Sequence, residues 1–140
     1  MSVTTFAAIS IGSYEIELKI FEISPKTGIR EIDRISHVIE LGRDTYNKDK
    51  ISFEMVDKLC GILYDFSYIM KGYKVKAYRA CATSAIREAV NSKNVLDRVK
   101  VRTGLDIELL SNSEQRFISY KAFSMQDEII EQAMNECTLL

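Results

Sequence analysis

The chain has 140 residues, of which 46% are hydrophobic and 28% are charged, and its formal net charge at pH 7 is −1. This composition is typical of one globular domain with a buried core, and it argues against disordered, collagen-like and disulfide-rich classes. The 19 basic residues are balanced by 20 acidic residues. The chain therefore lacks the positive excess of a general duplex-DNA binder, although a local basic patch can still bind a small polyanion.

The three cysteines, Cys60, Cys81 and Cys137, are widely spaced and match neither a metal-binding motif nor a disulfide framework. Such cysteines are typical of a reducing compartment, so we expect a cytoplasmic protein. The apolar stretch near the start is short and has no basic flank, and no segment is long enough to cross a bilayer. We therefore expect no signal peptide and no membrane association. The single histidine, His37, excludes multi-histidine metal sites.

The first forty residues have the pattern of three strands, at 6–11, 16–23 and 29–39. The first run is almost continuously apolar, as in a strand that is buried on both faces. The second run alternates between apolar and polar residues, as in a half-exposed strand. Turn signals at Gly12-Ser13 and at residues 25–28 separate the runs. The three segments are therefore predicted to form an antiparallel meander.

Residues 42–50 are polar, and we predict a loop there. A helix is predicted over residues 52–70, because its apolar residues recur every three or four positions. Its predicted buried face consists of Val56, Leu59, Leu63 and Phe66. Strands at 74–79 and 107–110 and helical segments at 85–89 and 92–102 complete the pattern. This order predicts an α/β fold with a mixed five-stranded sheet and helices on its faces.

The segment Ser111-Asn112-Ser113-Glu114 has the spacing of a capping box, with serine at the cap and glutamate three residues later. It predicts the start of another helix, and a further helical segment is predicted at 127–136. Residues 137–140 have the pattern of a strand that has barely begun. Because such a strand needs a partner, we expect this chain to be part of a larger architecture.

Four segments together carry a family resemblance: AAISIGS at 7–13, RACATSAIREA at 79–89 followed by Asn91, LSNSEQR at 110–116 and, more weakly, VIELG at 38–42. In this order and spacing the chain resembles the N-terminal domain of the exopolyphosphatase / guanosine pentaphosphate phosphatase (Ppx/GppA) family, within the actin, sugar kinase and Hsp70 ATPase superfamily. The resemblance implies a ribonuclease-H-like half-domain over residues 1–140, followed in the family by a second domain. Between the two domains, inorganic polyphosphate or a guanosine polyphosphate would lose its terminal phosphate to water, with Mg²⁺.

Two of these segments match the phosphate-binding positions of the family. Gly12 and Ser13 form a turn after a strand, where the backbone N–H groups and the serine hydroxyl can contact phosphate oxygens. Thr83 and Ser84 lie between a strand and a helix, and Arg87 follows one turn later with a guanidinium that suits phosphate. From the residues alone, an ordinary hairpin turn explains Gly12 and Ser13 equally well. For Thr83, Ser84 and Arg87, the residues alone favour a helix cap and a solvated arginine over a phosphate site.

The catalytic positions of the family are altered in this chain. Gln115 stands at the position of the family's glutamate, and an amide can orient a water but cannot accept its proton. The neighbouring Glu114 is rotated by about 100° on a helix, so its simplest role is in the capping box. Ser10 stands where the family has an aspartate that helps to hold Mg²⁺, and a neutral hydroxyl is a poorer ligand for this ion.

Three functions from different classes remain open at this point. The first is a phosphatase that removes the terminal phosphate of polyphosphate or guanosine pentaphosphate, and the second is a degenerate homologue that binds such a ligand and regulates without hydrolysis. The third is a structural module that forms a homodimer. Ser10, Gln115 and the negative charge of Glu15 near the expected phosphate site favour slow or absent hydrolysis by the full-length protein. Residues 1–140 alone are expected to be inactive, because half of the cleft would be missing.

Overall fold

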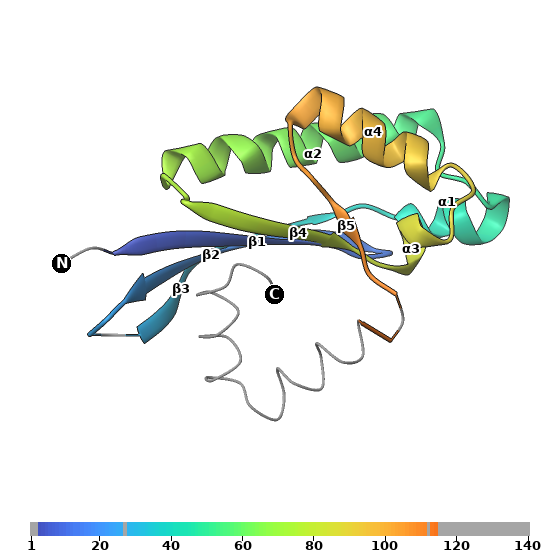
Figure 1. Cartoon of the computed structure of the whole chain (residues 1–140). Helices are drawn as coiled ribbons and strands as arrows, with labels where there is room; N and C mark the ends of the chain where they lie inside the picture. Colours follow the sequence, from blue (N-terminus) through green and yellow to red (C-terminus); the bar gives the residue numbers. More distant parts are fainter. Residues whose placement is uncertain (1–2, 27, 112, 115–140) are drawn as a thin grey trace.

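The computed structural model describes residues 3–26, 28–111 and 113–114. A five-stranded mixed sheet has the strand order β3-β2-β1-β4-β5. Strands β1 (Thr4–Ile11), β2 (Glu15–Ser24) and β3 (Gly28–Val38) are antiparallel neighbours, as Figure 1 shows. Strand β4 (Ala77–Ala82) is parallel to β1, and β5 (Glu108–Leu109) is parallel to β4. The predicted α/β fold with a mixed five-stranded sheet is therefore confirmed.

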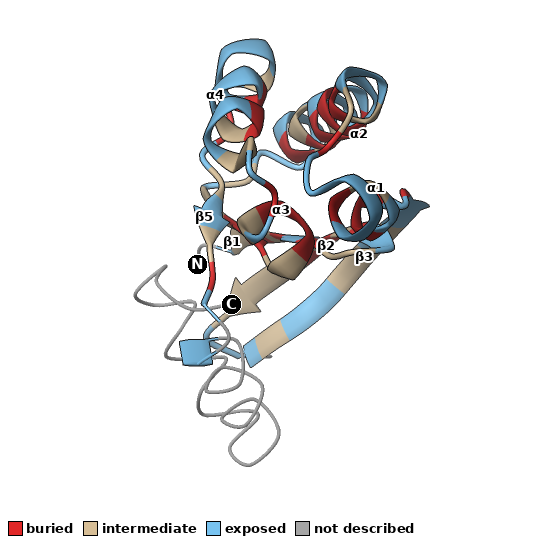
Figure 2. Ribbon diagram, turned by 90° about the vertical axis from the view of Figure 1, so that its right-hand side faces the viewer, coloured by how far each residue is buried: buried red, intermediate tan, exposed pale blue. Residues whose placement is uncertain are grey.

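Four helices belong to the described part of the chain: α1 (Leu41–Lys48), α2 (Phe53–Gly72), α3 (Ser84–Arg87) and α4 (Ser92–Thr103). Helices α2 and α4 lie over one face of the sheet, and α1 and α3 lie at one end of it (Figure 1). Figure 2 shows that the buried parts of these helices face inward. The predicted apolar face of the long helix is confirmed by the burial of Val56, Leu59, Leu63 and Phe66.

The pairing register explains which side of the sheet carries the core. Residues Ala7, Ile9 and Ile11 of β1 are at most 2% exposed and belong to the core cluster. Their partners on β2, and Ala80 and Ala82 on β4, belong to the same cluster, and the remaining partner, Tyr78, packs against it. Because side chains alternate along a strand, Ser10 points to the opposite face, where its register partners are Glu17 and Cys81.

The loop predicted at 42–50 is wrong, because most of this segment forms α1. Only Leu41, Gly42 and Thr45 of α1 are buried, so the segment lacks the periodic apolar signal from which helices are predicted. The helix is instead held by polar contacts with other segments, and it ends at Asp49, whose φ of 62° lies in the left-handed region.

The strand predicted at 74–79 begins later in the structure, at Ala77. The N–H of Val75 donates to the carbonyl of Met70 at 3.1 Å, and Lys74 has a φ of 56°. These residues therefore terminate α2 rather than begin the strand. The strand predicted at 107–110 is present but shorter, at Glu108–Leu109. The helical segment at 127–136 and the terminal strand start lie outside the described residues.

Candidate functional site

Three of the segments that carry the family resemblance meet at one edge of the sheet. Because β1, β4 and β5 are parallel, their carboxyl ends lie together. The N–H of Thr83 donates to the carbonyl of Ile11 at 3.3 Å, and the N–H of Leu110 donates to the carbonyl of Ala82 at 2.9 Å. Gly12, Thr83 and Leu110 therefore begin three adjacent loops. The carboxyl ends of parallel strands are the usual place for ligands in α/β proteins.

Three hydroxyl groups from three different elements meet at this edge, and we call them the hydroxyl cluster. Ser13 follows β1, Tyr46 belongs to α1, and Ser84 begins α3. The Tyr46 hydroxyl lies 2.7 Å from Oγ of Ser84 and 3.3 Å from Oγ of Ser13. The two serine oxygens are 3.4 Å apart. Two of the predicted phosphate-binding residues, Ser13 and Ser84, are therefore brought together across the cluster.

Helix α1 is fixed to both of these loops by hydrogen bonds and close packing. The N–H of Gly42 donates to the carbonyl of Ser13 at 2.8 Å, and the buried Thr45 hydroxyl donates to the carbonyl of Ala85 at 2.6 Å. A Cβ at position 42 would lie 2.9 Å from Cβ of Ser13 and 3.0 Å from Cε2 of Tyr46. Glycine at this position therefore allows α1 to approach the turn after β1.

The backbone N–H groups of Gly12 and Thr83 already donate hydrogen bonds within the protein. The N–H of Gly12 donates to the carbonyl of Glu15 at 2.9 Å, so this amide closes the hairpin and does not point to a ligand as expected. A Cβ at Gly12 would lie only 3.3 Å from the same carbonyl, which explains the glycine. Thr83 precedes α3 without a side-chain capping hydrogen bond, so the cap interpretation does not account for its hydroxyl.

Arg87 lies at the same edge, and its guanidinium interacts with the protein. Its Nη1 donates to the carbonyl of Leu110, which joins α3 to the end of β5, and its Nη2 lies 3.6 Å from the carboxylate of Glu88. The side chain is only 21% exposed. The interpretation of Arg87 as a solvated surface residue is therefore wrong. The guanidinium has a structural role and also places positive charge at the edge where Ser84 lies.

The capping box at Ser111 and Glu114 is confirmed by two reciprocal hydrogen bonds. The N–H of Ser111 donates to Oε1 of Glu114 at 3.1 Å, and the N–H of Glu114 donates to Oγ of Ser111 at 3.1 Å. The Ser111 N–H holds the pKa of the Glu114 carboxyl below its ordinary value. This carboxylate is thus ionised and engaged in the cap near neutral pH. Gln115 lies outside the described residues.

The described residues do not provide the oxygen ligands that Mg²⁺ prefers. The exposed Ser10 contributes one neutral hydroxyl on the sheet face. Its neighbour Glu17 interacts with Lys19 at 3.6 Å, with Arg34 at 4.0 Å and with the Ser36 hydroxyl at 3.2 Å. Within ranges 3–26, 28–111 and 113–114, no three acidic, histidine or cysteine side chains are grouped as a metal site. The donor set of this part of the chain therefore does not fit the ion.

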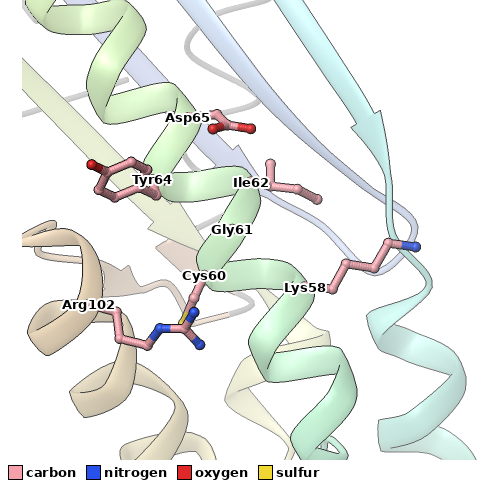
Figure 3. Close-up of a pocket in the computed structure, with 7 residues that line it drawn as sticks. All are labelled: Lys58, Cys60, Gly61, Ile62, Tyr64, Asp65 and Arg102. Carbon is pink, nitrogen blue, oxygen red and sulfur yellow. The ribbon is translucent and has the colours of Figure 1, made fainter.

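A separate hollow of about 440 Å³ lies between α2 and α4 and shares no residue with the hydroxyl cluster. Figure 3 shows Arg102 of α4 beside Cys60 of α2, with Tyr64 on the same side of the helix. Burial raises the pKa of the Cys60 thiol, which therefore stays protonated at neutral pH. The hollow thus lacks a reactive thiolate. No helix in the described ranges has the length and apolar character needed to cross a membrane.

Comparison with known proteins identifies the family of this fold. The model of the Ppx/GppA phosphatase family matches residues 20–131 of the chain. The chain belongs to this family. The crystal structure of the Aquifex aeolicus family member superimposes with a TM-score of 0.82 at 26% identity, over 89% of this chain and 41% of the other. An exopolyphosphatase from Cytophaga hutchinsonii has the same fold, with a TM-score of 0.74 at 24% identity over 79% of this chain and 35% of the other.

Curated sequence relatives are also exopolyphosphatases. Exopolyphosphatase 1 of Mycobacterium tuberculosis is 25% identical over 114 residues, which cover 81% of this chain and 33% of that protein. Exopolyphosphatase 1 of Mycobacterium leprae is 33% identical over 78 residues, which cover 56% of this chain and 23% of that protein. The chain thus spans about a third or less of the length of these relatives.

Sequence reasoning missed two residues that join distant segments of the Ppx/GppA domain. Tyr46 lies in the segment predicted as a loop, where a single exposed tyrosine gives no periodic signal. Asn91 belongs to the segments that carry the resemblance, but a lone asparagine gives no signal of its partner. Its side chain accepts a hydrogen bond from the N–H of Ile51 at 3.1 Å and donates to the carbonyl of Ile51 at 2.9 Å.

Proposed function

We propose that this chain forms one wall of a cleft that binds the terminal phosphates of inorganic polyphosphate or guanosine pentaphosphate. The observation that carries the proposal is the meeting of Ser13 and Ser84, which are 71 positions apart in the sequence and 3.4 Å apart at their hydroxyl oxygens. Membership of the Ppx/GppA family and the exopolyphosphatase relatives support this class of ligand. The other wall belongs to a part of the protein outside these 140 residues.

Each residue at the edge has a distinct role in this proposal. The hydroxyls of Ser13, Thr83 and Ser84 donate to phosphate oxygens, and Gly12 permits the tight turn that presents Ser13. Arg87 supplies a permanent positive charge while its bond to Leu110 holds it in place. Hydroxyl donors and one guanidinium together suit a polyanion that must be held by its end.

We further propose that hydrolysis by the full-length protein is slow or absent. Ser10 supplies no carboxylate for Mg²⁺, and Glu114 is engaged in the capping box. Gln115 cannot accept a proton from water. These three positions favour a second candidate function, a regulatory protein that binds polyphosphate or a guanosine polyphosphate without turnover. If catalysis occurs, the carboxylates that hold Mg²⁺ must come from residues beyond those described.

The test uses the whole natural polypeptide, with Mg²⁺, and measures both phosphate release and calorimetric binding. Wild type is compared with Ser84→Ala and with the control Ser67→Ala, whose hydroxyl bonds only within α2 on the exposed surface. We expect binding of polyphosphate or guanosine pentaphosphate that Ser84→Ala weakens and Ser67→Ala does not.

The possible results separate the candidate functions. Binding without turnover supports the regulatory function. Rapid Mg²⁺-dependent release by wild type contradicts the proposal of impaired hydrolysis and directs the search for a base to Glu114. Absence of any polyanion binding refutes the cleft itself and leaves the structural module, which a measurement of oligomeric state then tests.

A further inference from the structure

We infer that Tyr46 is a third hydroxyl ligand of the terminal phosphate, and that it binds together with Ser13 and Ser84. This inference rests on the proposed function and assigns a residue to it that neither the sequence pattern nor the family resemblance indicated. The carrying observation is that the Tyr46 hydroxyl lies 2.7 Å from Ser84 and 3.3 Å from Ser13.

Tyr46 is both accessible to a ligand and fixed in position. The residue is 56% exposed, and its hydrogen bonds to Ser13 and Ser84 lie at the surface. Its ring edge lies against Gly42, where a Cβ would be 3.0 Å from Cε2. Gly42 in turn donates its N–H to the carbonyl of Ser13. The turn after β1 and the tyrosine are therefore held as one unit, which limits the entropy that the ring would lose on binding.

The hydrogen-bonding capacity of the cluster suits an anion. Each hydroxyl has one proton to donate and two lone pairs, so three hydroxyls in mutual contact can satisfy one another in the absence of a ligand. A phosphate oxygen is a stronger acceptor than a neutral hydroxyl, and hydrogen bonds to charged groups are stronger than neutral ones. The three protons can therefore turn to one anionic oxygen without any movement of the backbone.

Among the three groups, the phenol hydroxyl is intrinsically more acidic than the two aliphatic serine hydroxyls. A more acidic hydroxyl is a better hydrogen-bond donor to an anion. In the described structure, no carboxylate contacts the Tyr46 hydroxyl, whose hydrogen-bond partners are the two serines. The Tyr46 hydroxyl thus supplies a donor beside Ser84 and adds no negative charge that would repel a phosphate.

The experiment measures binding of sodium tripolyphosphate to the whole natural polypeptide by calorimetry. Tyr46→Phe keeps the ring and removes only the hydroxyl, and we expect the dissociation constant to rise about tenfold. The matched control is Tyr64→Phe, which removes an equally exposed hydroxyl on α2, away from the cluster, and should leave binding unchanged. Chemical denaturation of both variants checks that the fold is retained.

A double-mutant cycle distinguishes a shared ligand contact from a general structural effect. If Tyr46 and Ser84 contact one phosphate together, the combined variant Tyr46→Phe/Ser84→Ala should lose less affinity than the product of the two single losses. Labelled tyrosine NMR gives a direct readout, because the Tyr46 ring signal should shift with tripolyphosphate while the Tyr64 signal does not.

The outcomes separate this inference from the proposed function. Equal tripolyphosphate affinity of wild type and Tyr46→Phe, with an unmoved ring signal, overturns the role of Tyr46 and leaves the cleft intact. A wild type that binds no tripolyphosphate overturns both. If turnover is measurable, a rise in KM with little change in kcat supports a binding contact, and a fall in kcat alone contradicts it.

Discussion

Gly42 and Gly61 both lie inside helices, yet the structure gives them opposite tolerance to a side chain. A Cβ at Gly42 would meet Ser13 and Tyr46 at 2.9 and 3.0 Å, whereas a Cβ at Gly61 would have nothing within 4 Å. We expect Gly42→Ala to destabilise the protein by about 1–3 kcal/mol through overpacking. Gly61→Ala should instead stabilise α2 by about 0.5–1 kcal/mol, because alanine restricts the unfolded chain.

Urea denaturation of the two variants measures this difference in stability. Because both variants replace glycine by alanine within a helix, Gly61→Ala is the control for the change in helix propensity. Because Gly42→Ala also displaces Tyr46 and Ser13, the variant should weaken tripolyphosphate binding as well. Equal stability of the two variants would contradict the close approach of α1 to the turn after β1.

Also at the residue scale, the carboxyl of Asp44 has a pKa that changes when the protein folds. The N–H of Ser52 donates to Oδ2 of Asp44 at 2.9 Å and holds the pKa of that carboxyl below its ordinary value. A pKa that is lower in the folded state contributes stability above the unfolded value of about 3.9, and the contribution is lost as the pH falls through the folded value.

We therefore expect Asp44→Asn to be less stable than wild type at neutral pH, with a deficit that shrinks as the pH falls below about 4. Parallel chemical denaturation of the two proteins across the acidic range measures the deficit. A deficit that is independent of pH would show that the charge on Asp44 has no part in it.

At the scale of elements, Asn91 joins the start of α4 to the connection between α1 and α2. Its amide makes two hydrogen bonds with the backbone of Ile51, which is only 2% exposed. The neighbouring N–H of Val90 donates to the carbonyl of Asp49 at 2.8 Å. These contacts explain why an asparagine suits the position: a single side chain can accept from the N–H and donate to the carbonyl of the same residue.

Asn91→Ala should cost about 2 kcal/mol of unfolding free energy, because two partly buried backbone groups would lose their partners. The control is Asn94→Ala, which removes an exposed amide from the same helix and should change stability little. Denaturation midpoints of both variants provide the comparison. A loss for Asn91→Ala no greater than that for Asn94→Ala would contradict the role of the Asn91 amide.

At the scale of the whole molecule, the question is whether catalysis can be restored. The family resemblance matches Ser10 and Gln115 to two positions at which we expect carboxylates in the Ppx/GppA family, one for Mg²⁺ and one for the attacking water. Loss of a positioned general base typically reduces the rate by about 10²–10⁴-fold. We propose that Ser10→Asp and Gln115→Glu together raise polyphosphate hydrolysis more than the product of the two single effects, because both groups act on one transition state.

Phosphate release by the whole natural polypeptide and its three variants, with and without Mg²⁺, measures this coupling. Glu17→Gln, on the same sheet face as Ser10, is a control that alters charge without providing a ligand at position 10. Independent effects of the two substitutions, or rapid polyphosphate hydrolysis by wild type, would contradict the proposal that the site lacks both carboxylates.

Much of the sheet and the long helix could be predicted from local patterns. The alternation in β2, the apolar run of β1 and the spacing of apolar residues in α2 are consequences of a single buried face, which leaves a periodic trace in the sequence. The turns between β1, β2 and β3 are short, so their antiparallel pairing also follows from neighbouring residues. The family resemblance selected Ser13 and Ser84 as candidate ligands but gave no distance between them.

What only the tertiary structure decided depends on contacts between distant segments. Helix α1 has little apolar periodicity and is held by Gly42 and Thr45 through hydrogen bonds to Ser13 and Ala85, so its own residues do not reveal it. The engagement of the Gly12 amide in the hairpin likewise follows from the turn geometry. Tyr46 reaches Ser84 only because α1 forms and packs at the carboxyl ends of parallel strands. Polar contacts of this kind are made one at a time and leave no repeating pattern along the chain, which is why the hydroxyl cluster could be recognised only in the folded protein.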